Sequence, residues 1–234
     1  MQRIILIETS TALCSVALAE DGNITAYRES SAPKAHASLT SVFIDDMLKE
    51  RGVTLADCDA ICVSKGPGSY TGLRVGVSTA KGLCFGSGKP LLAVGTLDTL
   101  VAQATAERLT VIPDLIGDPL HIIPMIDARR MEVYTAVFEN GKQIMETAPV
   151  IIDETSFTEY LEKGPCLFIG DGAGKCADVI KHPNAHFLQC WPKASAMLKP
   201  ALDAYKEERF EDVAYFEPFY LKEFVATVSK KKLW

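Results

Sequence analysis

The chain has 234 residues, of which 48% are hydrophobic and 23% are charged, a composition typical of globular proteins and unlike that of disordered or fibrous chains. Its 24 Lys and Arg stand against 30 Asp and Glu, which gives a formal net charge of −6. Because affinity for nucleic acid comes largely from clustered Lys and Arg, we expect so acidic a chain to bind RNA poorly unless a partner assists it.

The sequence also predicts a cytoplasmic protein without membrane contact. Its apolar runs are as long as strands and are interrupted, so none is expected to span a membrane. The apolar run after Arg3 is too short for the hydrophobic region of a signal peptide. The seven cysteines are scattered and include no Cys-x-x-Cys pair, as expected of buried thiols in a reducing compartment.

Strands and helices are expected to alternate through the first half of the chain. A continuous apolar run over residues 4–7 is typical of a strand buried on both faces. Apolar residues then recur at helical spacing over residues 35–51, and Gly52 is expected to end that helix. The predicted order is three strands, a helix, a strand, a helix, a strand and a helix, over residues 4–7, 14–19, 24–28, 35–51, 60–64, 72–85, 91–94 and 96–107.

The second half repeats this pattern. A shift of 119 residues (123 − 4) brings Ile4 onto Ile123 and Glu8 onto Asp127, and the strand, glycine turn and strand that follow also coincide. A helix over residues 155–163 and a strand over residues 166–169 are expected next. Chance is the alternative, since apolar strands and glycine turns are common. The shared element order and the shared position of the acid favour a duplication.

Two copies of a βββαβαβ unit predict an α/β fold that resembles the two-lobed architecture of actin, Hsp70-type ATPases and sugar kinases, the ASKHA or RNase H-like fold. We expect an N-terminal lobe over residues 1–109 and a C-terminal lobe over residues 110–234. Residues 110–121, which contain Pro113, Gly117 and Pro119, are the expected linker. In this architecture, the turn between the first two strands of each lobe faces a nucleotide's phosphates across the cleft.

The glycine-rich stretch over residues 66–74 is the most informative motif. It joins a strand to a helix through Gly-Pro-Gly-Ser-x-Thr-Gly, and such a loop offers backbone N–H groups and a positive helix end to an anion. A tight turn that binds nothing is the alternative. In the helix that follows, Gly72, Gly76 and Ala80 form a stripe of small residues. Since glycine inside a helix costs about 1 kcal/mol relative to alanine, we expect another helix to approach there closely, either from a partner or from this chain.

The acids that end the first strand of each half are candidate phosphate or metal contacts. Glu8 and Asp127 would form a plausible kinase or ATPase pair. After Asp127, however, Arg129, Arg130 and Met131 stand where a phosphate-binding turn needs small residues, so both acids capping turns or pairing with arginine is the alternative. The four histidines form no metal set, and the C-terminal lysines are expected to be a solvated tail, with contact to RNA as the minor alternative.

Several motifs together resemble those of the TsaB (YeaZ) family over residues 4 to about 222. The glycine stretch through Leu83 is the most specific of them. The others are Ile7–Thr11, Ser15–Leu18, His36 at the start of a helix, Asp127–Arg129, Glu132–Tyr134, Gly170–Ala173 and Pro218–Lys222. The resemblance implies a bacterial cytoplasmic protein that assists threonylcarbamoyl modification of the tRNA adenosine next to the anticodon.

The catalytic relative TsaD shares the N-terminal pattern but carries a metal-binding His-x-x-x-His pair after its fifth strand. In this chain, Thr96 and Leu100 occupy those positions. A threonine hydroxyl is a poor metal ligand and leucine is none, so we expect no such metal site. The resemblance therefore points to the non-catalytic partner, with no catalytic residue, metal or cofactor of its own.

The resemblance also implies partners. TsaB proteins pair with TsaD through the first two helices of the N-terminal lobe, and TsaE, an ATPase, joins them. We expect the same helices to form a homodimer when TsaD is absent, and tRNA to be bound only by the complex. The expected contact residues are His36, Leu39, Phe43, Met47, Gly72, Leu73, Gly76, Val77 and Ala80.

A small-molecule kinase or ATPase of the same fold is the alternative function. It predicts ATP at a phosphate loop that would be vestigial in a scaffold protein, formed by Glu8, Thr9, Ser10, Thr11, Gly66, Pro67, Gly68 and Ser69. The bulky turn after Asp127 disfavours a nucleotide. The family's old glycoprotease label implies a metallopeptidase, but these residues include no metal site that such an enzyme would need.

Overall fold

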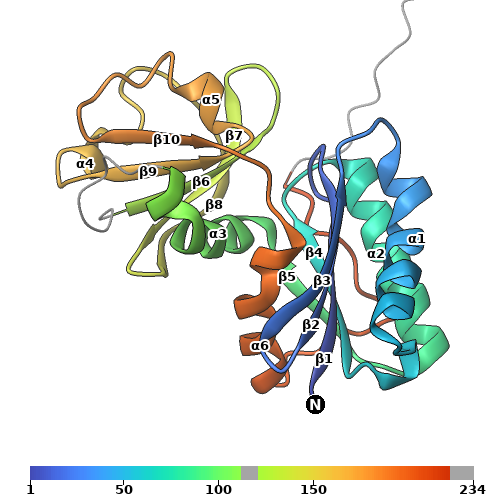
Figure 1. Ribbon diagram of the computed structural model, residues 1–234. Helices are drawn as coiled ribbons and strands as arrows, with labels where there is room; N and C mark the ends of the chain where they lie inside the picture. Colours follow the sequence, from blue (N-terminus) through green and yellow to red (C-terminus); the bar gives the residue numbers. More distant parts are fainter. Residues whose placement is uncertain (112–120, 222–234) are drawn as a thin grey trace, which may run out of the picture.

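The computed structural model describes residues 1–111 and 121–221, with residues 107–111 described by their backbone alone (Figure 1). Within these residues, no helix is both long and apolar enough to cross a bilayer. The expected linker and the lysine tail lie largely outside the described residues.

The chain forms two five-stranded mixed sheets with the same topology. The first has the order β3-β2-β1-β4-β5, and the second has the equivalent order β8-β7-β6-β9-β10. In each sheet, the first strand pairs antiparallel with the second and parallel with the fourth. The predicted duplication is therefore confirmed. The strands are β1 (Arg3–Glu8), β2 (Cys14–Glu20), β3 (Asn23–Ser30), β4 (Ala60–Gly66), β5 (Leu91–Gly95), β6 (His121–Asp127), β7 (Glu132–Glu139), β8 (Lys142–Ile151), β9 (Cys166–Gly170) and β10 (Ala185–Gln189).

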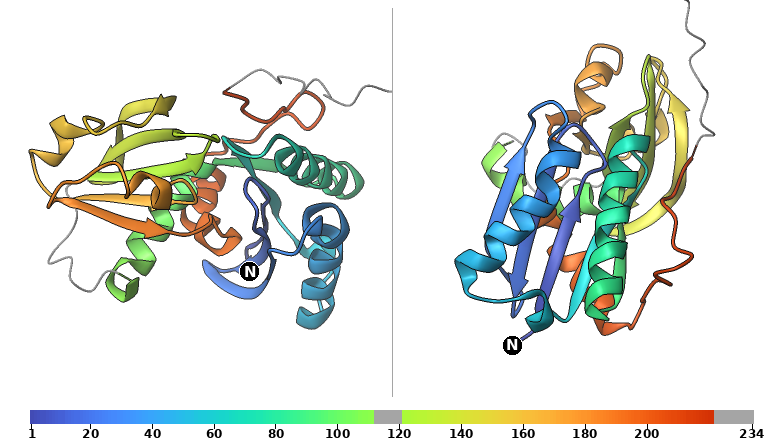
Figure 2. Two further views of the ribbon diagram at one scale, coloured as in Figure 1. Left: turned by 90° about the horizontal axis from the view of Figure 1, so that it is seen from above. Right: turned by 90° about the vertical axis from the view of Figure 1, so that its right-hand side faces the viewer.

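Helices cover both faces of the first sheet. The helices α1 (Ala35–Arg51) and α2 (Tyr70–Ser87) lie side by side on one face, as Figure 2 shows, and bury residues such as Ile44 and Val77 against it. The other face is covered by η2 (Ala194–Met197) and α6 (Leu198–Lys206). The 3-10 helix η1 (Leu55–Asp57) precedes β4. Because both faces are covered, β1 can be apolar on both faces over residues 4–7, as its sequence predicts.

Local sequence explains where the two long helices of the first lobe begin and end. Gly52 has φ 64°, and its N–H donates to the carbonyl of Lys49 at 3.1 Å, so it ends α1 as predicted. The side chain of Ser69 accepts a hydrogen bond from the N–H of Gly72 and caps α2, which begins at Tyr70.

The second sheet is covered by α3 (Thr96–Val111) on one face and by α4 (Thr158–Leu161) and α5 (Ala173–Cys176) on the other. Leu97 and Leu100 of α3 pack with Ile126 and Ile169 of this sheet. The expected boundary between residues 109 and 110 falls inside α3, and the packing does not follow it, because α3 packs in the second core and α6 in the first.

Parts of the second half differ from the prediction, which also did not include α5, η2 and α6. The helix expected over residues 155–163 is reduced to α4, because the Asp153 side chain binds the N–H and hydroxyl of Thr155 and the hydroxyl of Ser156, which holds a turn there. In addition, Phe157 has φ 63°, outside the helical region. The strand β10 was not predicted, because its apolar pattern is short and follows Pro183.

After α6, residues 207–221 form a return segment that runs back along the first lobe. The N–H of Glu211 donates to the carbonyl of Leu91 at 2.9 Å, and the N–H of Phe219 donates to that of Lys65 at 2.7 Å. Lys81 of α2 donates to the carbonyls of Ala214 and Phe216, both at 3.0 Å. These bonds fix the return segment beside α2 and the end of β4.

Candidate functional site

The turn after β1 and the glycine loop after β4 meet at one edge of the first sheet, because β1 and β4 are parallel neighbours. The N–H of Ser69 donates to the carbonyl of Ser10 at 2.6 Å. A Cβ added at Gly68 would lie 2.3 Å from that oxygen, so glycine is needed for the two segments to approach this closely. The structure thus brings together residues 8–11 and 66–69, the positions expected to form a phosphate loop.

Glu8 is fully buried in this turn. Its Oε1 atom accepts hydrogen bonds from the N–H of Ser10 at 2.7 Å and from the hydroxyl of Ser64 at 3.0 Å. Its Oε2 atom has no partner among the described residues. Burial raises the pKa of this carboxyl to about 7, and the hydrogen bonds counteract only part of the rise. Glu8 can therefore hold or release a proton near neutral pH.

Further polar groups at this edge are buried without a hydrogen-bond partner in the described part of the chain. They are the hydroxyls of Thr9, Ser10, Thr11 and Thr96. Buried groups of this kind are ordinarily satisfied by ordered water or by a ligand. Together with Glu8 they form a cluster of buried polar atoms, although Thr9 Oγ1 lies against Gly76 of α2.

Two N–H groups at the start of α2 are already engaged by the chain itself. The N–H of Ser69 donates to Ser10, and the N–H of Gly72 donates to the hydroxyl of Ser69 at 3.3 Å. The prediction that the loop offers its N–H groups to an anion is therefore wrong at these two positions.

The equivalent turn of the second lobe is built around a lysine. Lys175 Nζ donates to the Asp127 carboxylate at 2.5 Å and to the carbonyls of Arg130 and Glu132, both at 2.7 Å. Asp127 Oδ1 also accepts from the N–H of Arg129 at 2.8 Å. Both acids therefore cap their turns, as the alternative interpretation held, and the charge that pairs with Asp127 belongs to a lysine.

Asp171 supports the same turn from the neighbouring strand β9. Its Oδ1 atom accepts from the N–H of Asp127 at 2.9 Å. Burial raises the pKa of Asp171 to about 6. The turn thus combines one carboxylate bound to Lys175 with a second that is partly protonated near pH 6.

The residues expected to contact a partner lie mostly inside the chain. Of the nine, His36, Leu39 and Phe43 are half-buried, and the ring of His36 donates to the carbonyl of Thr11 at 2.8 Å. The buried ones are Met47, Gly72, Leu73, Gly76, Val77 and Ala80.

Two glycines of α2, Gly72 and Gly76, are explained by packing within this chain. A Cβ added at Gly76 would lie 2.2 Å from Thr9 Oγ1, and one added at Gly72 would lie 2.1 Å from the Thr9 carbonyl oxygen. The stripe of small residues therefore lets α2 approach its own sheet. A partner on these helices could not contact the buried glycines directly, whereas Leu39 and Phe43 of α1 stay partly exposed.

The outer face of α2 was missed, although helical periodicity could have found it. Ser78, Gly82 and Phe85 follow one another at i, i+4 and i+7 and point away from the buried stripe. Phe85 is 88% exposed, and a Cβ added at Gly82 would meet no atom within 4 Å. On the adjacent helix, Val42 is 49% exposed.

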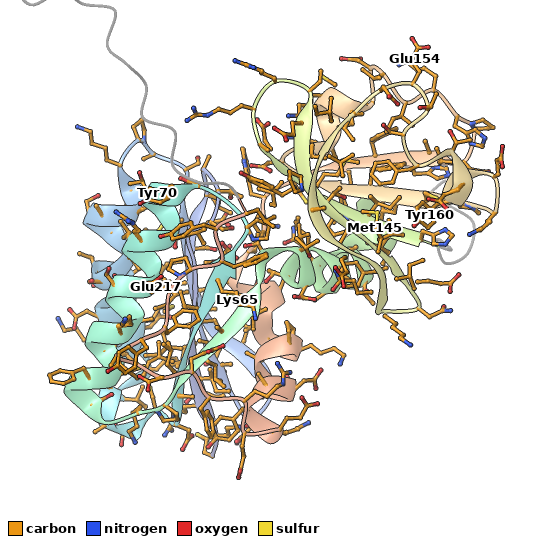
Figure 3. The ribbon with its side chains drawn as sticks, turned by 180° about the vertical axis from the view of Figure 1, so that it is seen from behind. Lys65, Tyr70, Met145, Glu154, Tyr160 and Glu217 are labelled. Atoms are coloured by element: carbon orange, nitrogen blue, oxygen red, sulfur yellow. The ribbon has the colours of Figure 1, made fainter. Side chains whose placement is uncertain are left out.

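At the start of α2, the return segment adds a second cluster. The ring of Tyr220 lies 4.9 Å from that of Tyr70, and the Arg74 guanidinium lies 4.1 Å from the Tyr70 ring centre. Figure 3 places Tyr70 near the upper end of α2 and Glu217, from the return segment, lower along the same helix.

The described residues contain no group of three or more His, Cys, Asp or Glu placed to hold a metal ion. Thr96 and Leu100 are both buried, and Leu100 packs in the core beneath α3. A cavity of about 800 Å³ lies between α3, α6 and the turn at Asn140 and Gly141, with mostly apolar walls. Its walls include none of the residues 8–11 and 66–69.

Comparisons with known proteins agree with this architecture. The family model described as "TsaD: tRNA N6-adenosine threonylcarbamoyltransferase" matches residues 28–162, more than half of the chain. The tRNA threonylcarbamoyladenosine biosynthesis protein TsaB of Escherichia coli K12 is 31% identical, with 96% of each chain covered. The TsaB protein of Haemophilus influenzae is 28% identical over 98% of this chain and 96% of its own.

A solved structure titled YeaZ, from Pseudomonas aeruginosa, superimposes with a TM-score of 0.80 at 27% identity, covering 94% of this chain and all of its own. The two-lobed fold expected from the duplication is thus that of a protein with detectable sequence similarity. The chain belongs to the TsaB (YeaZ) family, within the wider group that the TsaD family model describes.

Proposed function

We propose that this chain is a non-catalytic subunit that pairs with a TsaD-type enzyme, recruits a TsaE-type ATPase and supports threonylcarbamoyl modification of tRNA in the cytoplasm. The names of its relatives support the pathway. The observation that carries the pairing is the exposed outer face of α1 and α2, which we call the helical face. It consists of Val42, Ser78, Gly82 and Phe85.

The helical face has the composition of a contact surface. Phe85 is 88% exposed and Val42 of the adjacent helix is 49% exposed, and exposed apolar patches mark interaction sites. Ser78 and Gly82 leave the helix surface flat beside that ring, so a partner helix could approach closely. Tyr215, 84% exposed, extends the patch, because Lys81 ties its neighbours Ala214 and Phe216 to α2.

Co-purification with a TsaD-type subunit tests this surface. The Phe85→Asp and Gly82→Arg variants are expected to weaken binding about thirtyfold or more, as removal of an interface anchor does. Both positions are open to solvent, so both variants should fold. Ile144→Asp, at an exposed apolar position of the other lobe, is the matched control. Unchanged binding by the two helical-face variants would refute the assignment.

A change at Gly76, in the predicted stripe, is unsuited to this test. Because its added Cβ would lie 2.2 Å from Thr9 Oγ1, an arginine there would disturb the chain's own packing. Loss of binding by Gly76→Arg would then report folding and say nothing of the partner.

In the absence of a TsaD-type subunit, the helical face is proposed to pair with a second copy of this chain. Phe85→Asp should then convert a dimer to a monomer in sedimentation experiments, with Ile144→Asp remaining dimeric. If the wild-type chain is monomeric at high micromolar concentration, the homodimer proposal fails.

The buried hydroxyls around Glu8 favour one alternative, a kinase or ATPase that holds phosphate there. The engaged N–H groups of Ser69 and Gly72 disfavour it. Calorimetry of the isolated chain with ATP and Mg²⁺ separates the two: low-micromolar binding would support the alternative. Reconstitution of tRNA modification from TsaD-type and TsaE-type subunits, with and without this chain, tests the scaffold function directly.

A further inference from the structure

The turn between β6 and β7 holds two successive arginines in an uncommon backbone conformation. Arg129 has φ 72° and Arg130 has φ 51°, the left-handed region that side chains other than Gly, Asn and Asp seldom adopt. Unusual backbone of this kind persists only where surrounding contacts impose it, and it often lies at functional sites. The turn is at the upper edge of the second lobe in Figure 1.

The contacts that impose this conformation come from Lys175. Its ammonium group has three N–H donors, and all three have acceptors in the turn: the Asp127 carboxylate and the carbonyls of Arg130 and Glu132. The N–H of Ala128 donates to the Glu132 carbonyl at 3.1 Å, and the N–H of Glu132 donates to the Arg129 carbonyl at 3.2 Å. The backbone beneath the two arginines is therefore fixed.

The two guanidinium groups, by contrast, are exposed and unpaired. Neither Arg129 nor Arg130 makes a side-chain hydrogen bond or ion pair with any described residue. The other arginines whose side chains are described all have one. Arg3 and Arg51 bind Glu20, Arg28 binds Glu50, Arg74 binds Tyr220 and Arg209 binds Glu207.

Acids close to the turn do not neutralise the two arginines. The carboxylate of Asp127 is bound by Lys175, and that of Asp153 accepts from Thr155 and Ser156. Two adjacent arginines that pair with no described residue, on a fixed turn, offer a local binding site for an anion in a chain of net charge −6.

We infer that Arg129 and Arg130 contact phosphate groups of the tRNA backbone when this chain is part of the complex described under the proposed function, on which the inference rests. One guanidinium can bind two phosphate oxygens at once, and because the backbone of the turn is already fixed, only the two side chains have to be ordered on binding. The helical face lies on the other lobe, so a partner bound there leaves the turn outside the proposed contact. Because the whole chain is acidic, such a contact has to be local, and RNA affinity has to come mainly from the partner.

The test measures tRNA affinity of the reconstituted complex over a series of salt concentrations. Each phosphate contact contributes about 0.7–0.9 to the slope of log affinity against log salt, so the double variant Arg129→Ala/Arg130→Ala should lower that slope by about 1.5. The variant Arg129→Lys/Arg130→Lys keeps both charges and should keep most of the slope. Arg28→Ala with Arg209→Ala, which removes two exposed but paired arginines, is the matched control and should change nothing.

Three outcomes would overturn the inference. An unchanged slope with the double alanine variant shows that the turn does not contact phosphate. An equal loss in the control pair shows a general charge effect. Loss of TsaD-type or TsaE-type binding, with the salt slope kept, assigns the turn to an acidic protein surface. If the wild-type chain forms no complex at all, the proposed function fails first, which size-exclusion chromatography shows before any RNA is added.

Discussion

Replacing Glu8 by Gln should stabilise the protein, and more strongly as pH rises. The pKa of this carboxyl is 4.5 in a solvated reference and about 7 in the folded chain, so the folded state binds the proton more tightly than the unfolded state does. Below pH 4.5 both states are protonated and Glu8 costs nothing. Above that pH the unfolded state ionises first, and the cost of keeping Glu8 buried grows until pH passes about 7.

The linkage relation gives the size of the effect. With these two pKa values, Glu8 disfavours the folded state by about 1 kcal/mol at pH 5 and by about 3 kcal/mol at pH 8. The amide oxygen of Gln can still accept from the N–H of Ser10 and the hydroxyl of Ser64. Glu8→Gln should therefore gain about 1 kcal/mol at pH 5 and about 3 kcal/mol at pH 8.

Urea unfolding of both proteins at pH 5, 6, 7 and 8 measures this difference. Comparing the two proteins at each pH cancels the titration of all other groups. A difference that stays constant or shrinks as pH rises would show that Glu8 is ionised in the folded state, with a partner such as a bound cation. The reasoning from burial would then be refuted.

Three further predictions follow from individual contacts. Glu20→Gln should destabilise the protein at neutral pH and leave its stability unaffected near pH 1, because Arg3 and Arg51 hold the pKa of Glu20 at about 2. Acid unfolding curves of the variant and the wild type measure the difference. Gly82→Ala should raise the free energy of unfolding by about 0.5–1 kcal/mol, because the added methyl group meets no atom within 4 Å. Gly76→Ala should lower it by about 1–3 kcal/mol because of the clash with Thr9. Thermal unfolding of the two variants measures both changes. Lys81→Met should increase amide hydrogen exchange over residues 213–219 while the midpoint of global unfolding moves little.

The duplication could be predicted because short local patterns in the sequence indicate each of its strands and turns. Runs such as Ile4–Ile7, the acids at 8 and 127 and the glycine turns each follow from one short stretch of sequence, and their order gives the topology. Which sheet a helix covers is decided by contacts between distant residues. Nothing near Leu97 or Leu100 indicates that α3 packs on the second sheet, and α6 gives no local sign that it returns to the first.

The sequence predicted which residues meet at the candidate site, but it did not show which neighbour the small-residue stripe of α2 faces. Residues 8–11 and 66–69 meet as expected, because strand order alone brings them to one edge. The stripe at Gly72 and Gly76 is equally compatible with a partner helix and with the chain's own sheet, and only the position of Thr9 decides between them. That Arg129 and Arg130 pair with no acid among the described residues could not be predicted from the sequence either, because ion pairing depends on which acids the fold places nearby.

The two turns show how duplicated halves can diverge around one position. Glu8 is buried, faces hydroxyls and has a pKa near 7, whereas Asp127 is 45% exposed and is bound by Lys175. A lysine that fills the space beside the acid removes the need for an external cation there, and the two left-handed arginines it fixes replace the small residues of a phosphate-binding turn. A nucleotide bound between the lobes would need both turns, and the second is already occupied by this chain's own charges. The contacts of Lys175 that disfavour a nucleotide at this turn also fix the backbone that presents the two exposed guanidinium groups, so one structural feature supports both proposals.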